Sequence, residues 1–112
     1  MEEQAMSDVR NFFEGLSAKV NKDRIAGMNS TFQFTITGAD AQTWNIKIAG
    51  GEVAVNEGAA DAVNVEIIMA DADFADLIAG KLNSMAAFTS GKLKVKGDMT
   101  LSLKLGPIFG IS

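Results

Sequence analysis

Three aspartates, Asp71, Asp73 and Asp76, form the densest group of potential metal ligands in the chain. Carboxylate oxygens bind divalent cations, and a calcium loop presents them together with a central glycine and a distal glutamate. Neither residue stands at the required spacing here. The same three charges would complement the positive end of a helix dipole, with Asp71 as the N-cap. We therefore interpret them as a helix start and expect no bound metal.

Histidine and cysteine do not occur among the 112 residues. The chain consequently lacks the usual general base near neutral pH, the usual zinc ligands and the partner that activates a serine nucleophile. Catalysis would have to use lysines or carboxylates such as Glu52, Glu57 or Glu66, and nothing in the sequence holds these in a suitable environment. We therefore predict a protein that is not an enzyme and needs no cofactor, with carboxylate catalysis as the least favoured alternative.

Lysines alternate with apolar residues after Gly91, which places Lys92, Lys94 and Lys96 on one face of a strand. Lysines of this kind protect an exposed sheet edge from aggregation. They would also form a basic patch for an anionic lipid head group, a phosphate-bearing thioester or a membrane surface. In the second interpretation the head-group contacts are Lys81, Lys92, Lys94, Lys96 and Lys104. No Walker phosphate-binding motif accompanies these lysines.

The composition indicates one globular domain with an acidic surface. Hydrophobic residues make up 47% of the chain and charged residues 21%, so a compact core is favoured over disorder. A net charge of −4 argues against a nucleic-acid partner, which needs a basic surface. We expect residues 1–6 to be a loose tail and residues 7–112 to be the domain.

Several features predict a cytoplasmic location. The polar first ten residues do not resemble a secretory signal, and no apolar run reaches the ~18 residues of a membrane-spanning helix. The final residues Gly110-Ile111-Ser112 differ from the Ser-Lys-Leu tripeptide of peroxisomal import. The absence of cysteine fits a reducing compartment.

Hydrophobic periodicity predicts a helix followed by an antiparallel meander. A helical stripe runs from Val9 to Val20 behind a cap at Ser7 or Asp8. A short turn over residues 22–28 follows, and then three segments alternate with a period of two. The inward residues of these segments are Phe32, Phe34, Ile36, Trp44, Ile46, Ile48, Val53 and Val55.

The second half predicts two more strands and two helices. A fourth strand covers Val63 to Met69, and a helix follows that should end near Gly80. Asn83 is placed to cap a short helix that stops at Gly91, and a fifth strand takes Lys92 to Lys96 with Leu93 and Val95 facing inward. Beyond Asp98 the apolar residues fit a strand and a helix equally well.

Residues 69–105 closely resemble the sterol carrier protein type two family of non-specific lipid-transfer domains, and the likeness continues more weakly through Trp44 and the first strands. The matching motifs are Asp71-Ala72-Asp73-Phe74, Gly80-Lys81-Leu82, Ala87-Phe88, Gly91-Lys92-Leu93-Lys94-Val95 and Gly97-Asp98.

The resemblance implies an α+β fold in which helices cover one face of a five-stranded mixed sheet and enclose an apolar tunnel. It further implies a mostly helical last segment and a ligand such as a fatty acid, a fatty acyl-CoA or a sterol. Apolar residues on the elements that would face the tunnel are the predicted lipid contacts: Phe12, Leu16, Trp44, Phe74, Leu77, Ile78, Leu82, Met85, Phe88, Met99, Leu103 and Phe109.

We therefore expect a non-enzymatic lipid-binding and transfer protein, monomeric and in transient contact with membranes. The alternative is an accessory module that uses the same apolar groove to bind a partner protein or a second copy, because an exposed apolar surface is also typical of interfaces. The residues from Gly106 to Ser112 are predicted to form a lid over the pocket, since Gly106, Pro107 and Gly110 disfavour a regular helix there.

Overall fold

A computed structural model describes residues 3–20, 22–39, 41–104 and 108–109 of the chain. Its sheet contains β1 (Ser30–Thr37), β2 (Gln42–Ala49), β3 (Glu52–Glu57), β4 (Val65–Ala70) and β5 (Leu93–Gly97) in the order β3-β2-β1-β4-β5. The pair β1–β4 is parallel and the other pairs are antiparallel. The predicted five-stranded mixed sheet is therefore confirmed.

Strand register gathers the apolar side chains on one face of the sheet. Phe34 lies opposite Trp44 on β2 and opposite Ile67 on β4. Ile67 in turn lies opposite Val95 on the edge strand β5. Because side chains alternate across a strand, this register makes one continuous apolar face, and its central residues are buried.

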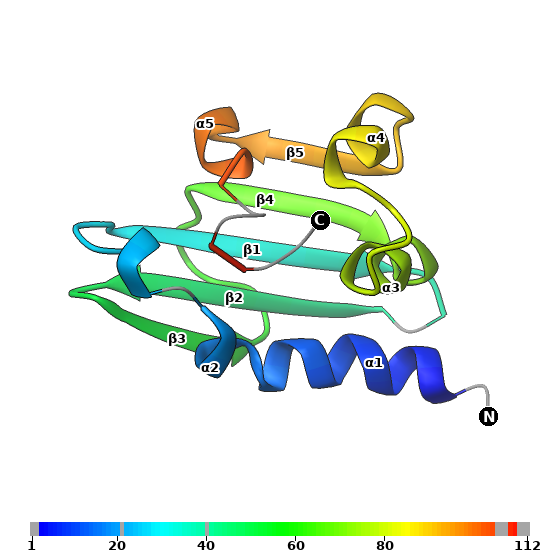
Figure 1. Cartoon of the computed structure of the whole chain (residues 1–112), viewed down its shortest axis with the longest axis horizontal. Coiled ribbons are helices and arrows are strands. Elements are labelled where there is room, and N and C mark those ends of the chain that lie inside the picture. The colour runs from blue at the N-terminus through cyan, green and yellow to red at the C-terminus, as the bar shows by residue number, and fades with distance from the viewer. Residues whose placement is uncertain (1–2, 21, 40, 105–107, 110–112) are drawn as a thin grey trace.

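Helices cover that apolar face (Figure 1). They are α1 (Glu3–Glu14), α2 (Leu16–Lys19), the 3₁₀ turn η1 (Lys22–Arg24), α3 (Asp71–Ile78), α4 (Ser84–Thr89) and α5 (Met99–Ser102). In Figure 1, α1 runs along the β2–β3 side of the sheet, whereas α4 and α5 stand at the two ends of β5. The arrangement matches the predicted α+β layering with one helical layer.

The N-terminal helix differs from the sequence prediction at both ends. It begins at Glu3, inside the expected loose tail of residues 1–6, because Glu3 to Met6 are good helix formers that can extend the first turns. It also breaks at Gly15 instead of continuing to Val20, since glycine is unfavourable inside a helix. The apolar stripe survives the break, because Val9, Leu16 and Val20 are all buried.

Glycine and asparagine set the boundaries of α3 and α4. Gly80 follows α3 with φ +80°, a conformation that glycine adopts without strain. The Asn83 side chain accepts hydrogen bonds from the backbone amides of Met85 and Ala86, as its predicted capping role requires. Asp71 is the first residue of α3 and not its N-cap, which is Ala70, although the Asp71 carboxylate accepts a hydrogen bond from the Ala72 amide in the first turn.

The segment after Asp98 is helical, in agreement with the resemblance and against the alternation of its leucines. The Asp98 carboxylate accepts from the amides of Thr100 and Leu101 and starts α5. Ile108 and Phe109 are buried beyond it. The remaining residues of the predicted lid lie outside the described ranges, at 106–107 and 110–112. No helix in the described part of the chain is long and apolar enough to span a membrane.

Candidate functional site

An aromatic cluster fills the space between the sheet and the N-terminal helix. The Phe13 ring stacks on Trp44 at a centroid distance of 5.1 Å and on Phe74 at 5.3 Å. Phe12 meets Phe74 edge to face at 5.5 Å. Rings at these distances and angles attract one another beyond the effect of burial. The cluster therefore joins α1 and α3 to the sheet.

The structure places six of the predicted lipid contacts in this core. Phe109 packs edge to face on Phe32 at 5.1 Å and lies 6.0 Å from Phe34. All six are at most 7% exposed: Phe12, Leu16, Trp44, Phe74, Leu77 and Phe109. In the arrangement described here they pack against protein, so an inner chamber would require them to move apart.

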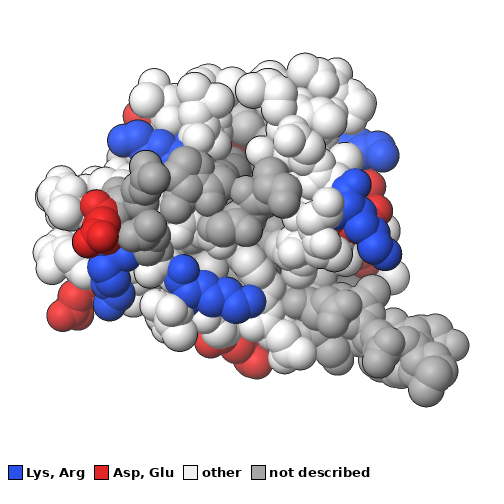
Figure 2. All heavy atoms as spheres, in the orientation of Figure 1, with Lys and Arg blue, Asp and Glu red and all other residues white. Residues whose placement is uncertain are grey.

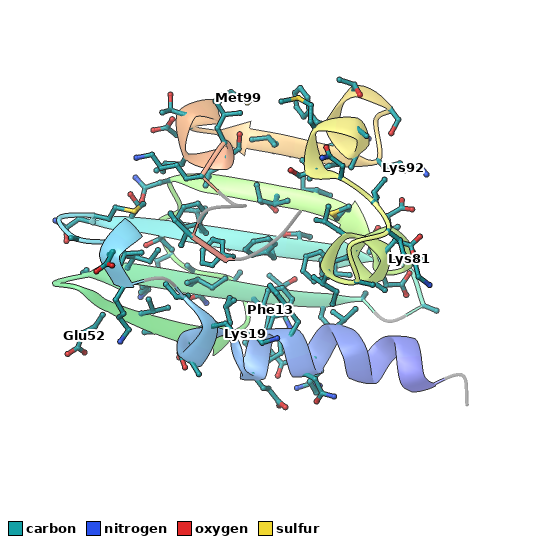
Figure 3. All side chains as sticks on the ribbon, in the orientation of Figure 1. Phe13, Lys19, Glu52, Lys81, Lys92 and Met99 are labelled. Carbon is teal, nitrogen blue, oxygen red and sulfur yellow. The ribbon has the colours of Figure 1, made fainter. Side chains whose placement is uncertain are left out.

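A second group of predicted contacts forms an apolar groove at the β5 edge. Met85 and Phe88 come from α4, Met99 from α5, and Leu103 from its C-cap. The floor is made by Leu93 and Val95 of β5, and Ser84 and Ser102 complete the lining. The groove has a volume of about 180 Å³. Figure 3 shows Met99 on α5 beside this strand.

The groove side chains are unusually open to solvent for their type. Met85 is 59% exposed, Phe88 43%, Met99 48% and Leu103 69%. Large apolar side chains gathered in this way usually mark a surface that binds something apolar. We refer to Met85, Phe88, Leu93, Val95, Met99 and Leu103 as the α4–α5 groove.

The last two predicted contacts, Ile78 and Leu82, belong to neither the groove nor the buried core. Both are half-buried and pack against the core from outside. Ile78 instead borders a separate hollow of about 270 Å³ between α1 and α3, together with Phe12 and Lys19. The structure therefore distributes the predicted lipid contacts among the buried core, the α4–α5 groove and the outer side of the core.

Leu93, Val95, Ser84 and Ser102 are groove residues that the sequence analysis did not assign to the site. The two strand residues were predicted to face inward, and that signal could have identified them. The edge position of β5 decides their role, since β5 is the last strand of the sheet in the described part of the chain.

All five predicted head-group lysines are exposed, and none lines the groove. Lys92 and Lys94 border a different hollow of about 390 Å³, together with Asp73. Lys104 directly follows Leu103 in sequence. Figure 3 shows Lys92 at the turn before β5 and Lys81 at the end of α3. Strand alternation turns Lys94 and Lys96 to the face of β5 opposite Leu93 and Val95. The predicted head-group lysines therefore lie outside the α4–α5 groove.

Two of the carboxylates named for the enzymatic alternative, Glu57 and Glu66, have structural hydrogen-bond partners, and Glu52 is exposed. Glu57 receives two hydrogen bonds from the Arg10 guanidinium, at 3.2 and 3.0 Å, and Arg10 also stacks over Trp44 at 5.4 Å. The hydrogen bonds from Arg10 lower the pKa of Glu57. Glu66 accepts a hydrogen bond from the Thr35 hydroxyl on the polar face of the sheet. In the described residues no cluster of acidic side chains could hold a metal ion.

The match to a known family covers nearly the whole domain. Residues 11–110 match the SCP-2 sterol transfer family, and the chain belongs to that family. A similar protein is hydroxysteroid dehydrogenase-like protein 2 of Xenopus tropicalis, 32% identical over 108 residues. The alignment covers 96% of this chain and 26% of that protein, so the chain spans about a quarter of the curated relative's length.

Solved structures of similar fold include two insect proteins. The sterol carrier protein domain 2 of Helicoverpa armigera has a TM-score of 0.73 and 27% identity, and the match covers 89% of this chain and 84% of that one. Palmitated SCP2L2 from Aedes aegypti also has a TM-score of 0.73, with 22% identity and coverage of 88% and 91%. The sheet and its helical layer are thus the fold of sterol carrier proteins.

Proposed function

We propose that this chain is a lipid-binding and transfer domain that holds the hydrocarbon part of its ligand in the α4–α5 groove. The observation that carries this proposal is the convergence of exposed apolar side chains from α4, β5 and α5 on one hollow, in a domain of the sterol transfer family. The domain itself contributes no catalytic step.

Hydrocarbon burial supplies enough free energy for such binding. Each methylene removed from water contributes about 0.8 kcal/mol, so ten of them give about 8 kcal/mol before ordering costs. That gross value corresponds to a micromolar dissociation constant. Affinity in this range allows a carrier to release its lipid again, because a membrane offers the chain a comparable environment.

The groove walls suit ligands of varied shape. Two of its side chains are methionines, Met85 and Met99, whose unbranched thioethers adapt to different neighbours. The Ser102 hydroxyl donates to the carbonyl of Met99, so a polar atom is already satisfied at the rim. A long chain would extend from the groove toward the core, and Phe109, Phe74 and their neighbours would become a tunnel wall as they part.

We propose a fatty acid, a fatty acyl-CoA or a sterol-like molecule as the ligand. The palmitated state of the Aedes aegypti protein supports a fatty acyl chain in a domain of this fold. The carboxylate or phosphate of such a ligand would remain at the surface, and we propose Lys104, which follows the groove residue Leu103, as its first contact. The other proposed head-group lysines, Lys81, Lys92, Lys94 and Lys96, are also exposed. We further propose that the carrier is a cytoplasmic monomer that does not bind nucleic acid.

The test combines native mass spectrometry of freshly purified protein with titration of a fluorescent fatty acid. Leu103→Asp places a charge in the groove wall and should weaken binding at least ten-fold, because the carboxylate must stay hydrated. Val63→Asp is the matched control, since Val63 is an exposed apolar residue away from the groove, at 37% exposure.

Equal affinities of the two variants, or no binding below about 100 µM, would reject the lipid-carrier proposal. Light scattering of the lipid-free protein decides the alternative function. A monomer agrees with a carrier, whereas a dimer that Leu103→Asp dissociates would assign the groove to self-association.

A further inference from the structure

The charges of this protein are distributed very unevenly along the chain. Residues 81–104 carry five lysines and one aspartate, a net charge of +4. The rest of the chain has five basic and thirteen acidic residues, a net charge of −8. An overall acidic protein therefore contains one strongly cationic segment, and that segment forms α4, β5 and α5.

Exposed apolar side chains concentrate in the same segment. Of the five large hydrophobic side chains that the structure describes as exposed, four belong to residues 85–103, and Val63 is the fifth. In Figure 2 uncharged surface covers the α4 and α5 region at the top of the molecule, with blue side chains at its two sides. Cationic and apolar side chains thus belong to the same segment, although Lys94 and Lys96 lie on the face of β5 opposite the groove.

Acidic residues on and beside this segment partly offset its lysines. The carboxylate of Asp98, the only acid in the segment, caps α5 through two backbone amides. Asp73 of α3 borders the hollow beside Lys92 and Lys94. Glu66 of β4 lies opposite Lys96 in the strand register. The remaining lysines, Lys81, Lys96 and Lys104, are exposed, and the segment keeps its net positive charge.

The amphipathic helix α1 is a less suitable surface in this structure. Its apolar residues Val9, Phe12 and Phe13 are buried against α3 and the sheet. To present them to a membrane, the helix would have to leave the core and break the aromatic cluster. The α4–α5 corner needs no such rearrangement, because its side chains are already exposed.

We propose that the α4–α5 corner is the surface with which this protein docks on an anionic lipid membrane. Methionine, phenylalanine and leucine side chains would enter the interface between head groups and acyl chains, while the lysines would pair with lipid phosphates and carboxylates. The inference rests on the proposed function in one respect: the same corner contains the groove, so lipid would pass between bilayer and groove without crossing water.

The first experiment measures flotation with phosphatidylcholine vesicles that contain about 30% phosphatidylserine, and with vesicles of phosphatidylcholine alone. Each lysine close to an anionic surface contributes about five-fold to partitioning. The double variant Lys92→Gln with Lys104→Gln should therefore bind the anionic vesicles about 25-fold less than the parent. Lys22→Gln with Lys47→Gln removes the same charge from exposed sites elsewhere and should bind within two-fold of the parent.

The second experiment identifies the docked face and exploits the absence of cysteine in the chain. Single cysteines carrying an environment-sensitive dye are placed at Ala86 on α4, at Thr100 on α5 and at Asn11 on α1, all exposed and none lining the α4–α5 groove. On anionic vesicles the dyes at Ala86→Cys and Thr100→Cys should shift to the blue and be quenched by spin-labelled lipid, whereas the dye at Asn11→Cys should not change.

Quenching at Asn11→Cys alone would overturn the proposal and assign the docking surface to α1. Equal losses of vesicle binding in the two lysine double variants would also overturn it, because binding would then depend on net charge alone. The absence of binding to either kind of vesicle would overturn it in favour of another partner. The fatty-acid titration separates this outcome from failure of the proposed function. Micromolar binding of the free fatty acid by the parent protein, without binding to vesicles, would overturn the docking proposal alone, whereas loss of both would overturn the proposed function as well.

Discussion

Truncation of Phe109 tests whether the C-terminal segment is part of the core or only a lid that covers the ligand. The Phe109 ring is 1% exposed and meets the rings of Phe32 and Phe34 edge to face. Phe109→Ala removes these contacts and leaves a cavity, a change that typically costs about 3–5 kcal/mol. This is a large part of the ~5–15 kcal/mol by which a small domain is stable. For a domain of this size the Tm should fall by roughly 12–20 °C.

Urea unfolding followed by circular dichroism measures this loss in lipid-free protein. Leu103→Ala serves as the matched control, because Leu103 is 69% exposed and its truncation should change stability by about 0.5 kcal/mol or less. If Phe109→Ala costs less than about 1 kcal/mol, the ring is not part of the core and the lid predicted from the sequence becomes the better description.

Three further measurements examine single features of the fold. NMR titration should give Glu57 a lower pKa in the parent than in an Arg10→Met variant. Because the pKa of Glu57 is depressed in the folded state, its pair with Arg10 stabilises the fold at pH values above the unfolded pKa. This contribution is lost as the pH falls through the folded pKa. A steeper acid loss of stability in Arg10→Met than in the parent would contradict this sign. Gly97→Ala should cost more than ~2 kcal/mol in thermal unfolding, since φ is +101° and a Cβ would collide with the Asn64 carbonyl; an unchanged Tm would disprove the collision. Asn83→Ala should cost about 1 kcal/mol by removing the cap of α4, and Asn83→Asp should retain most of it.

Much of the fold was predictable because the strands alternate so regularly. Phe32, Phe34 and Ile36 are separated by polar residues, and the structure buries all three on one face. The break at Gly15 was not predicted, since the apolar stripe continues across it and periodicity alone does not show where a helix is interrupted. The resemblance, and not the periodicity, predicted that α5 is helical.

The division of the candidate site could not be predicted in the same way. Phe74 and Phe88 are both apolar residues on helices, and sequence alone gives them the same role. The structure buries Phe74 under α1 and leaves Phe88 43% exposed beside the edge strand. That difference depends on strand order, which places β5 at the edge of the sheet, so that among the described residues no strand lies beyond the one that α4 and α5 flank.

Methyl NMR of the methionines tests most directly whether the α4–α5 groove receives lipid. Met85 and Met99 line the groove, whereas Met28 packs against the core elsewhere and serves as an internal control. On titration with palmitate, the Met85 and Met99 methyl signals should shift together and saturate at one equivalent, while the Met28 signal stays in place. Saturable binding that leaves Met85 and Met99 unchanged would contradict the assignment of the groove as the lipid site.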